Sequence, residues 1–272
     1  MPFVTDGRTL IDRAYEGAYA LPAFNVSSLA MIAACIQAAD LERAPIMLQT
    51  APGDLRHITP EVAAASTRAV AERAAVPVML HCDHSSGPEA ISRSLRAGYS
   101  SVMFDGDAYA LDENVRRTGA LAPFVHAAGA SLEAAAGSFG GKEEGASSEL
   151  HLTEPEAAAR LHEAGADMVA CSVGSVHAQA STLDLERLEA IHEVTRKPLV
   201  LHGGSGIPAA DLAAAVKLGV VKVNVSASLA RGVGRALQSG PDNHYTFYER
   251  ARAEVLRVAR EKIRLMNASG QA

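Results

Sequence analysis

Short apolar runs recur along the chain, and each is separated from the next by a longer amphipathic stretch, at intervals of roughly 20 to 35 residues. The runs predict buried strands and the longer stretches predict helices. The predicted strands are Tyr19–Val26, Pro45–Thr50, Pro77–His84, Ser101–Gly106, Ser131–Gly137, Met168–Gly174, Pro198–Gly203 and Val220–Val225. Eight strand–helix units without a hairpin signal predict an all-parallel sheet, and eight is the number that closes a barrel.

Helix signals lie between these runs. Thr59-Pro60 resembles an N-cap followed by proline at the first helical position. Thr153 and Glu156 have the spacing of a capping box that opens a helix to Ala164. The other helical predictions are an apolar face of Met31, Ile32, Cys35, Ile36 and Ala39, an inward stripe of Leu185, Leu188, Ile191 and Val194, and a tail helix from about His244 to Lys262 that covers the barrel or a partner subunit.

A length of 272 residues suits one α/β barrel, and no linker or change in composition marks a second domain. We therefore expect residues 1–272 to form a single (β/α)8 TIM barrel with an extra C-terminal helix. A doubly wound open sheet is the alternative architecture.

Composition narrows the partners and the location. A net charge of −6 and the absence of tryptophan argue against a nucleic-acid-binding surface. The sequence contains neither a signal-peptide pattern nor an apolar run of about 18 residues, so we expect neither secretion nor a membrane span. The three cysteines, Cys35, Cys82 and Cys171, form no CxxC pair, which favours a reducing cytoplasm.

Polar side chains follow the apolar runs at the ends of the predicted strands. In a barrel of this kind the chemistry lies at the C-terminal strand ends, so these residues are expected to surround one mouth. They are Asn25, Thr50, Asp83 with His84, Asp105, Glu133, His177, His202 with Ser205, and Asn224.

Three of these residues are histidines on different strands: His84, His177 and His202. Three imidazoles with one open position form a common catalytic zinc site, so we expect them to bind Zn²⁺. Any one of them alone would more simply be a hydrogen-bonded structural histidine, and His81, inside its strand, is expected to be structural. Asp83 is placed to act as a general acid and base, or to orient a ligand.

Two acidic residues and two glycine-rich stretches remain. Asp105 and Glu133 are expected to orient metal ligands, to offer an alternative metal position, or simply to form hydrogen bonds at the barrel rim. The stretch 201–208, which holds Gly203 and Ser205, runs into a helix and predicts a phosphate site, completed by Gly174 and by Asn224 with Ser226. The segment 137–145, with four glycines, is expected to be either a lid over the site or a solvated loop.

In these motifs the chain resembles the class II, zinc-dependent ketose-bisphosphate aldolases, which include the fructose- and tagatose-bisphosphate aldolases. The resemblance extends from about residue 5 to about residue 263. The matching motifs are Pro22–Val26, His81–His84, Ser101–Gly106, Val173–His177, Leu201–Gly206 and Lys222–Val225.

The resemblance implies zinc on the three histidines and a reaction that cleaves a ketose 1,6-bisphosphate or ketose 1-phosphate to dihydroxyacetone phosphate and an aldehyde. Asp83 would exchange the proton of the C4 hydroxyl, and Glu143 would move a proton at the triose-phosphate carbon. The family also implies a monovalent cation, Na⁺ or K⁺, and a homodimer or homotetramer. Dihydroxyacetone phosphate would be held by Asn25, Gly174, Gly203, Ser205, Asn224 and Ser226.

Several positions depart from the family pattern. Ala135 replaces the second acid of a Glu-x-Glu motif, Ala178 replaces a glycine after a zinc histidine, and Ala227 replaces a threonine hydroxyl. Asp107 stands where serine is common, and the loop after Glu144 is short. These changes leave the three histidines intact and make the identity of the ketose phosphate the open question.

Two other functions stay open at this point: a metal-dependent sugar-phosphate isomerase, epimerase or lyase, and a non-catalytic sugar-phosphate-binding accessory subunit. Lys222, near the end of the last strand, also suggests a Schiff-base mechanism, but the three histidines argue against that route.

Overall fold

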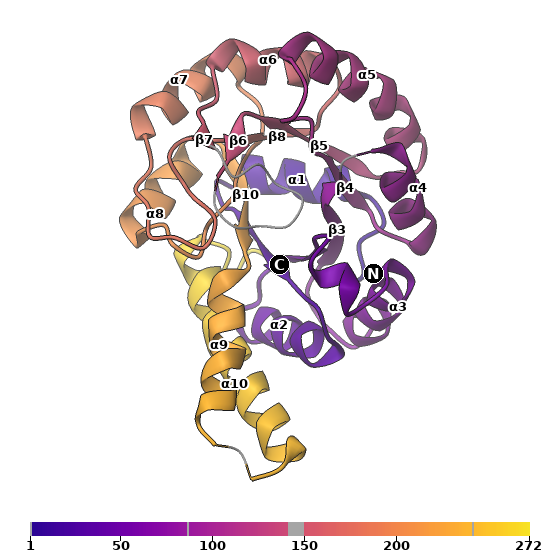
Figure 1. The fold of residues 1–272 in the computed structure, drawn as a ribbon, viewed down its shortest axis with the longest axis vertical. Coiled ribbons are helices and arrows are strands. Elements are labelled where there is room, and N and C mark those ends of the chain that lie inside the picture. The colour runs from indigo at the N-terminus through magenta and orange to yellow at the C-terminus, as the bar shows by residue number, and fades with distance from the viewer. Residues whose placement is uncertain (1, 86, 141–149, 241) are drawn as a thin grey trace.

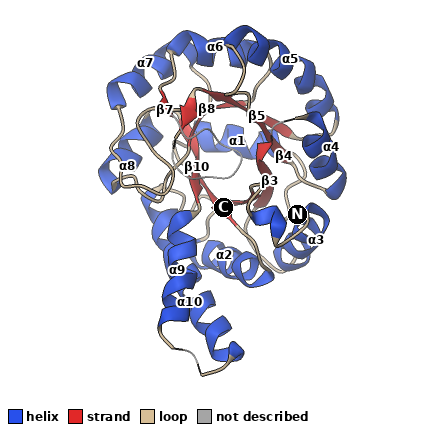
Figure 2. Cartoon of the chain, viewed as in Figure 1, coloured by secondary structure: helices blue, strands red, loops and turns tan. Residues whose placement is uncertain are grey.

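Eight parallel strands close into a barrel in this computed structural model, which describes residues 2–85, 87–140, 150–240 and 242–272 (Figures 1 and 2). The order around the barrel is β1-β10-β9-β8-β5-β4-β3-β2, so each strand lies beside its neighbours in the chain. The predicted TIM barrel is confirmed. Its strands are β1 (Leu21–Asn25), β2 (Ile46–Thr50), β3 (Val78–Ser85), β4 (Ser101–Phe104), β5 (Ser131–Ala136), β8 (Met168–Cys171), β9 (Leu199–Leu201) and β10 (Val220–Val225).

Most strands are shorter than the apolar runs that predicted them. Pro45, Pro77 and Pro198 each lie one residue before the first strand residue. Proline has no N–H to donate to the ladder, so it is tolerated at the start of a strand rather than within it. At the other end, Gly137 and Gly203 have positive φ of 86° and 73°, a left-handed conformation that turns the chain out of the sheet.

Helices form a ring around the barrel (Figure 2). An additional helix, α1 (Gly7–Glu16), was not expected; Asp6 caps it by accepting hydrogen bonds from the N–H groups of Arg8 and Thr9. Gly7 is packed against the carbonyl of Ser100, at the start of β4, so α1 closes the N-terminal end of the barrel. The outer helices are α2 (Leu29–Glu42), α3 (Pro60–Ala71), α4 (Pro88–Ala97), α5 (Leu111–Ala127), α6 (Pro155–Glu163), α7 (Leu185–Thr195), α8 (Ala209–Lys217) and α9 (Ala227–Gln238), with a short 3₁₀ helix, η1 (Asp54–Arg56).

Of the two predicted helix N-caps, one is confirmed and one is wrong. Thr59 caps α3 by accepting from the N–H of Val62, as expected. The capping box at Thr153 is wrong: the side chain of Thr153 is buried, where it donates to the carbonyl of Ala136 and accepts from the N–H of Ser172. It therefore ties the end of β5 to the end of β8, and Glu154 precedes α6 without a side-chain cap. The stripe on α7 is also narrower than predicted, because Val194 is 58% exposed.

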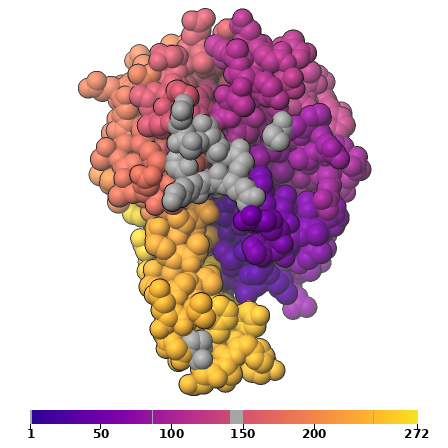
Figure 3. Space-filling view, in the orientation of Figure 1, coloured from indigo at the N-terminus to yellow at the C-terminus, as the bar shows by residue number. Residues whose placement is uncertain are grey.

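The expected tail helix is present as α10 (His244–Leu265). It packs against α2 and α9 of its own chain, and the α9–α10 hairpin projects beyond the ring of helices (Figures 1 and 3). Arg260 and Arg264 both pair with Glu42 of α2, each with an N–O distance of 2.7 Å. No helix in the described part of the chain is long and apolar enough to cross a membrane.

One hairpin corrects the all-parallel expectation. Outside the barrel, β6 (Ser138–Phe139) pairs antiparallel with β7 (Leu150–His151). Two-residue strands are too short to produce a period-two pattern, so the sequence offered no signal for them. The residues between the two strands include Glu143 and Glu144, which lie outside the described residues together with the rest of 141–149.

The barrel strands are buried on both faces, as expected for a parallel sheet covered by helices. Apolar side chains such as Phe24 and Leu48 fill most of this space. At the C-terminal ends, however, polar residues such as Asn25, His84 and Asn224 are buried as well. Buried polar groups need hydrogen-bond partners, so the hydrogen bonds of these residues show how the candidate functional site is built.

Candidate metal and substrate site

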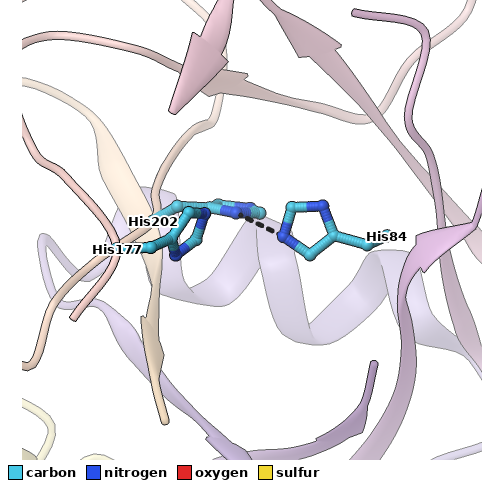
Figure 4. A group of neighbouring side chains, drawn as sticks. All are labelled: His84, His177 and His202. Carbon is cyan, nitrogen blue, oxygen red and sulfur yellow. Dashed lines mark hydrogen bonds between the residues drawn. The ribbon is translucent and has the colours of Figure 1, made fainter. Parts of the chain in front are cut away.

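His84, His177 and His202 meet at the C-terminal end of the barrel, although 118 residues of chain separate the first from the last (Figure 4). His84 lies near the end of β3, His177 in the loop after β8, and His202 directly after β9. All three are buried, and they offer ring nitrogens within 4.8 Å of one another. The structure therefore brings together the three residues that the sequence predicted as metal ligands.

Two carboxylates set the orientation of these rings. His84 Nδ1 lies 2.6 Å from Asp105 Oδ2, and His202 Nε2 lies 3.1 Å from Glu133 Oε1. A neutral imidazole that donates to a carboxylate through one nitrogen presents a lone pair on the other. The other ring nitrogens, His84 Nε2 and His202 Nδ1, lie 3.2 Å apart (Figure 4).

This arrangement fits a metal ion. Two ring nitrogens this close share either a proton or a cation. Zn–N bonds of about 2.0–2.1 Å in a tetrahedral site place two ligand nitrogens roughly 3.3 Å apart, close to the 3.2 Å found here. Burial holds the pKa of His202 well below its usual value, although the charge of Asp83 opposes it, so this ring is neutral and able to ligate. Three buried imidazoles therefore form a donor set that suits a transition-metal ion.

A bulge at the end of β3 lets consecutive residues enter the barrel. The pairing of β3 with β4 shifts register between Cys82 and Ser85, and His84 has a φ of +50°. A left-handed conformation at a non-glycine residue costs about 1–2 kcal/mol and is often found at functional sites. It allows both Asp83 and His84 to contribute to the site.

Asp83 is fixed by two amide side chains. Gln49 Nε2 donates to Asp83 Oδ2 at 2.8 Å, and Asn224 Nδ2 lies 3.1 Å from both carboxylate oxygens. Burial by itself would raise the pKa of Asp83, but His84 and Lys222 outweigh it and lower the pKa to about 2. The carboxylate is therefore ionised, with its lone pairs held in a defined direction.

Gln49 and Phe139, which contact predicted site residues, were not anticipated. Gln49 donates to both Asp83 and Asn25, each at 2.8 Å, and so links two predicted site residues. Its only signal was a polar side chain inside an apolar strand. Phe139 of β6 stacks on His202 with ring centroids 4.2 Å apart and an interplanar angle of 15°. No pattern in the sequence pointed to Phe139, because its position depends on the hairpin.

A cavity of about 360 Å³ opens beside His177. Its size is within the range of small-molecule sites. The described residues that line it include six that the sequence predicted: Asn25, His177, Gly203, Ser205, Asn224 and Ser226. Gly174, also predicted, is not part of this lining; it has a φ of +98° and packs near the carbonyl of Thr182.

The glycine-rich segment and the start of α9 form one wall of the cavity. A side chain at Gly203 would come within 3.2 Å of the carbonyl of Val176, so the chain there is close-packed. Ser205 Oγ accepts from the N–H of Ser228 at 3.0 Å, which joins this segment to the first turn of α9. Ser226 and Ala227 line the cavity where α9 begins. Free N–H groups at a helix start favour an anion such as phosphate.

Three positions that depart from the family pattern can now be located. Ala178 lines the cavity with a φ of +61°, which explains why glycine is the usual residue there. Ala227 also lines the cavity and has no hydroxyl to offer. Ala135 is buried in β5, and its carbonyl accepts from Asn114 Nδ2 at 2.9 Å.

Residues of η1 also line the cavity and were not part of the predicted site. Asp54 Oδ2 accepts from Asn25 Nδ2 at 2.8 Å and from the N–H of Ala51 at 3.0 Å. Arg56 also lines the cavity, so both signs of charge are present at its mouth.

Comparison with known proteins decides the family. Residues 5–271 match the family "Fructose-bisphosphate aldolase class-II". The chain belongs to the class II fructose-bisphosphate aldolase family. It is 32% identical over 277 residues to the "Probable fructose-bisphosphate aldolase" of Bacillus subtilis (strain 168), with 97% of each chain covered.

Solved structures of proteins described as aldolases are also similar. The YdjI aldolase from Escherichia coli K12 is 30% identical with a TM-score of 0.88, and the match covers 97% of this chain and 98% of that one. A putative fructose-1,6-biphosphate aldolase from Coccidioides immitis is 27% identical with a TM-score of 0.91 and 98% coverage of both chains. As a member of this family the protein is a lyase that acts on phosphorylated sugars, and the family is generally metal-dependent.

Proposed function

We propose that this class II aldolase is zinc-dependent and reversibly cleaves a ketose 1,6-bisphosphate or ketose 1-phosphate, similar to fructose or tagatose bisphosphate, to dihydroxyacetone phosphate and an aldehyde. The observation that carries the proposal is the set of three buried histidines whose ring nitrogens lie within 4.8 Å of one another, in a barrel end that also holds the ionised Asp83. A metal ligand set and a carboxylate base are the two groups that cleavage through an enediolate requires.

His84, His177 and His202 would hold the zinc ion, which would act as a Lewis acid toward the enediolate oxygens. Asp105 and Glu133, which lie beside His84 Nδ1 and His202 Nε2, would keep these rings in the ligating tautomer. In the cleavage direction, Asp83 accepts the proton of the C4 hydroxyl as the C3–C4 bond breaks, and it returns the proton in condensation. Its low pKa keeps it available as the base.

The remaining roles follow from the family pattern. Glu143 is proposed to protonate the triose-phosphate carbon. Gly203, Ser205, Asn224 and Ser226 are proposed to bind the dihydroxyacetone-phosphate part on the wall of the cavity near α9. Asn25 and Gly174 complete the proposed set; Asn25 lines the cavity, whereas Gly174 would contribute through the backbone of its loop.

Lys222 is poorly suited to a Schiff-base reaction. Its ammonium is fully buried and donates to Glu133 Oε2 at 2.8 Å. A lysine nucleophile must lose its proton and meet the substrate carbonyl, and Lys222 is not part of the described cavity lining. This observation favours the metal-assisted route.

The proposal is tested by incubating the protein with a panel of phosphorylated ketoses and measuring triose phosphate and bound zinc on the same sample. We expect one zinc ion per chain and cleavage of at least one ketose, with activity lost in His177→Ala, in Asp83→Ala and after treatment with a strong chelator. His57→Ala, which removes an exposed histidine outside the site, serves as the matched control and should retain activity. Cleavage by metal-free protein would refute the mechanism, and zinc binding without turnover on any ketose would instead favour an accessory role.

Three further properties are proposed on the family resemblance: a monovalent cation, a homodimer or homotetramer, and a cytoplasmic location. Activity measured in Na⁺, K⁺ and a bulky organic cation tests the first, and light scattering of the purified protein tests the second. Fractionation of the source cells tests the third.

A further inference from the structure

A second group of ligating side chains lies beside the three histidines in the barrel interior. His81, Asp83 and Glu133 are fully buried, and each offers a nitrogen or oxygen atom within 4.8 Å of the others. One imidazole and two carboxylates form a donor set suited to a divalent cation. Among the residues that the structure describes, this is the only such group besides the three histidines.

Lys222 inserts its ammonium into this second group from β10. Its Nζ lies 2.8 Å from Glu133 Oε2 and 3.9 Å from Asp83 Oδ1, and its side chain is fully buried. Two carboxylates so far from water are costly unless a positive charge compensates them. The lysine therefore supplies the charge that a bound cation would otherwise supply.

The contact with Lys222 also determines which partner each carboxylate oxygen of Glu133 has. Oε2 accepts from Lys222, whereas Oε1 faces His202 Nε2 at 3.1 Å. With one oxygen held by the ammonium, the other is available to orient the ring of His202. Without Lys222, Glu133 would be free to turn toward a metal ion as a ligand of its own.

We propose that Lys222 is a positioning residue that occupies the place of a second cation among His81, Asp83 and Glu133, and so keeps the centre to one metal ion. The inference rests on the proposed function to the extent that the metal ion is assigned to the three histidines. It predicts that removing the ammonium opens a second cation site.

The test counts metal ions in Lys222→Met, which keeps the length of the side chain and removes its charge. Metal-free protein is titrated with Co²⁺, followed by the visible absorption of the ion and by metal analysis after gel filtration. We expect wild-type protein to bind one Co²⁺ per chain and Lys222→Met to bind two. The double variant Lys222→Met/Glu133→Gln should again bind one Co²⁺ per chain. It lacks the ammonium of Lys222, but it also lacks the Glu133 carboxylate that the second ion would need as a ligand.

Lys262→Met is the matched control. Lys262 is also buried, but it donates to the carbonyl of Gly204, outside the second group. The Lys262→Met protein should still bind one Co²⁺ per chain. Thermal unfolding supplies an independent readout, since Co²⁺ should raise the melting temperature of Lys222→Met more than that of wild type. A purely structural lysine would not produce this metal-dependent rescue.

Lys222→Met that binds a single Co²⁺ with wild-type affinity would overturn the proposal, as would a variant that cannot be recovered folded even when refolded with Co²⁺. None of these measurements needs a substrate. A wild-type protein that binds one ion but cleaves no ketose phosphate would therefore refute the proposed function and leave this inference standing.

Discussion

Hydrogen bonds join the polar side chains of this site to one another. Asp83 is held between Gln49 and Asn224, and Gln49 in turn holds Asn25, so one amide fixes both a proposed base and a residue of the cavity wall. A base that swings freely must be oriented in each turnover. Residues that hold a catalytic group in place typically contribute about 10–100-fold to activity.

We therefore expect Gln49→Leu to lower kcat by about 10–100-fold, with a smaller change in KM, because the substitution releases Asp83 without removing it. Steady-state kinetics on the ketose identified by the panel assay measures both constants. Gln238→Leu, at an exposed position near the end of α9, is the control and should match wild type. A Gln49→Leu enzyme with wild-type kcat would show that Asn224 alone suffices to orient the carboxylate.

At the level of single residues, the sequence predicted those whose chemistry is tied to a strand end. His84, Asp83 and Asn224 follow apolar runs directly, and the parallel barrel then determines that they meet. Gln49 and Phe139 could not be predicted in this way. The role of Gln49 depends on distances across the barrel, and that of Phe139 on a hairpin with no pattern of its own.

Among the elements, the fastening of α10 to α2 has a clear physical basis. The carboxylate of Glu42 is 8% exposed and receives hydrogen bonds from Arg260, Arg264 and Ser269. The bond from Arg264 is the main cause that lowers the pKa of Glu42, from 4.5 to about 2, although partial burial opposes it. The folded protein therefore binds this proton more weakly than the unfolded chain.

This difference predicts an acid-sensitive contribution to stability. It is complete above about pH 4.5 and is lost as the pH falls from 4.5 toward 2, because protonation of Glu42 favours the unfolded chain. Both arginines are largely solvated, so we expect only about 1 kcal/mol. Glu42→Gln should lose that amount near pH 6 and differ less from wild type below pH 3, as measured by urea unfolding at a series of pH values.

Glu72→Gln, at an exposed position after α3, is the control and should leave the unfolding free energy unchanged at every pH. An equal deficit for Glu42→Gln at pH 6 and pH 3 would mean that the amide perturbs packing rather than charge.

The elements also show which signals in the sequence were sufficient. All eight barrel strands were predicted. A strand that is buried on both faces has a continuous apolar sequence, which can be recognised without knowing the neighbouring strands. The errors involve contacts between distant segments. Thr153 has the local pattern of a helix cap, but the carbonyl of Ala136 and the N–H of Ser172 use its hydroxyl instead.

For the whole molecule, the site depends on closure of the barrel. His84 and His202 come from β3 and β9, which are not neighbours in the sheet, and they meet only because all eight strands surround one axis. The ring nitrogens His84 Nε2 and His202 Nδ1 lie 3.2 Å apart. A cation held by both rings would link β3 and β9 across the barrel mouth.

Metal binding should therefore stabilise the entire fold, because the unfolded chain does not hold the three histidines together. At a free metal concentration of 100 times Kd the expected gain is about 2.7 kcal/mol. We expect a strong chelator to lower the melting temperature of wild-type protein and added zinc to restore it, as followed by circular dichroism. His202→Ala should not respond to either addition, whereas His57→Ala should respond as wild type does. A chelator that abolishes cleavage without lowering the melting temperature would place the catalytic metal somewhere other than between these strands.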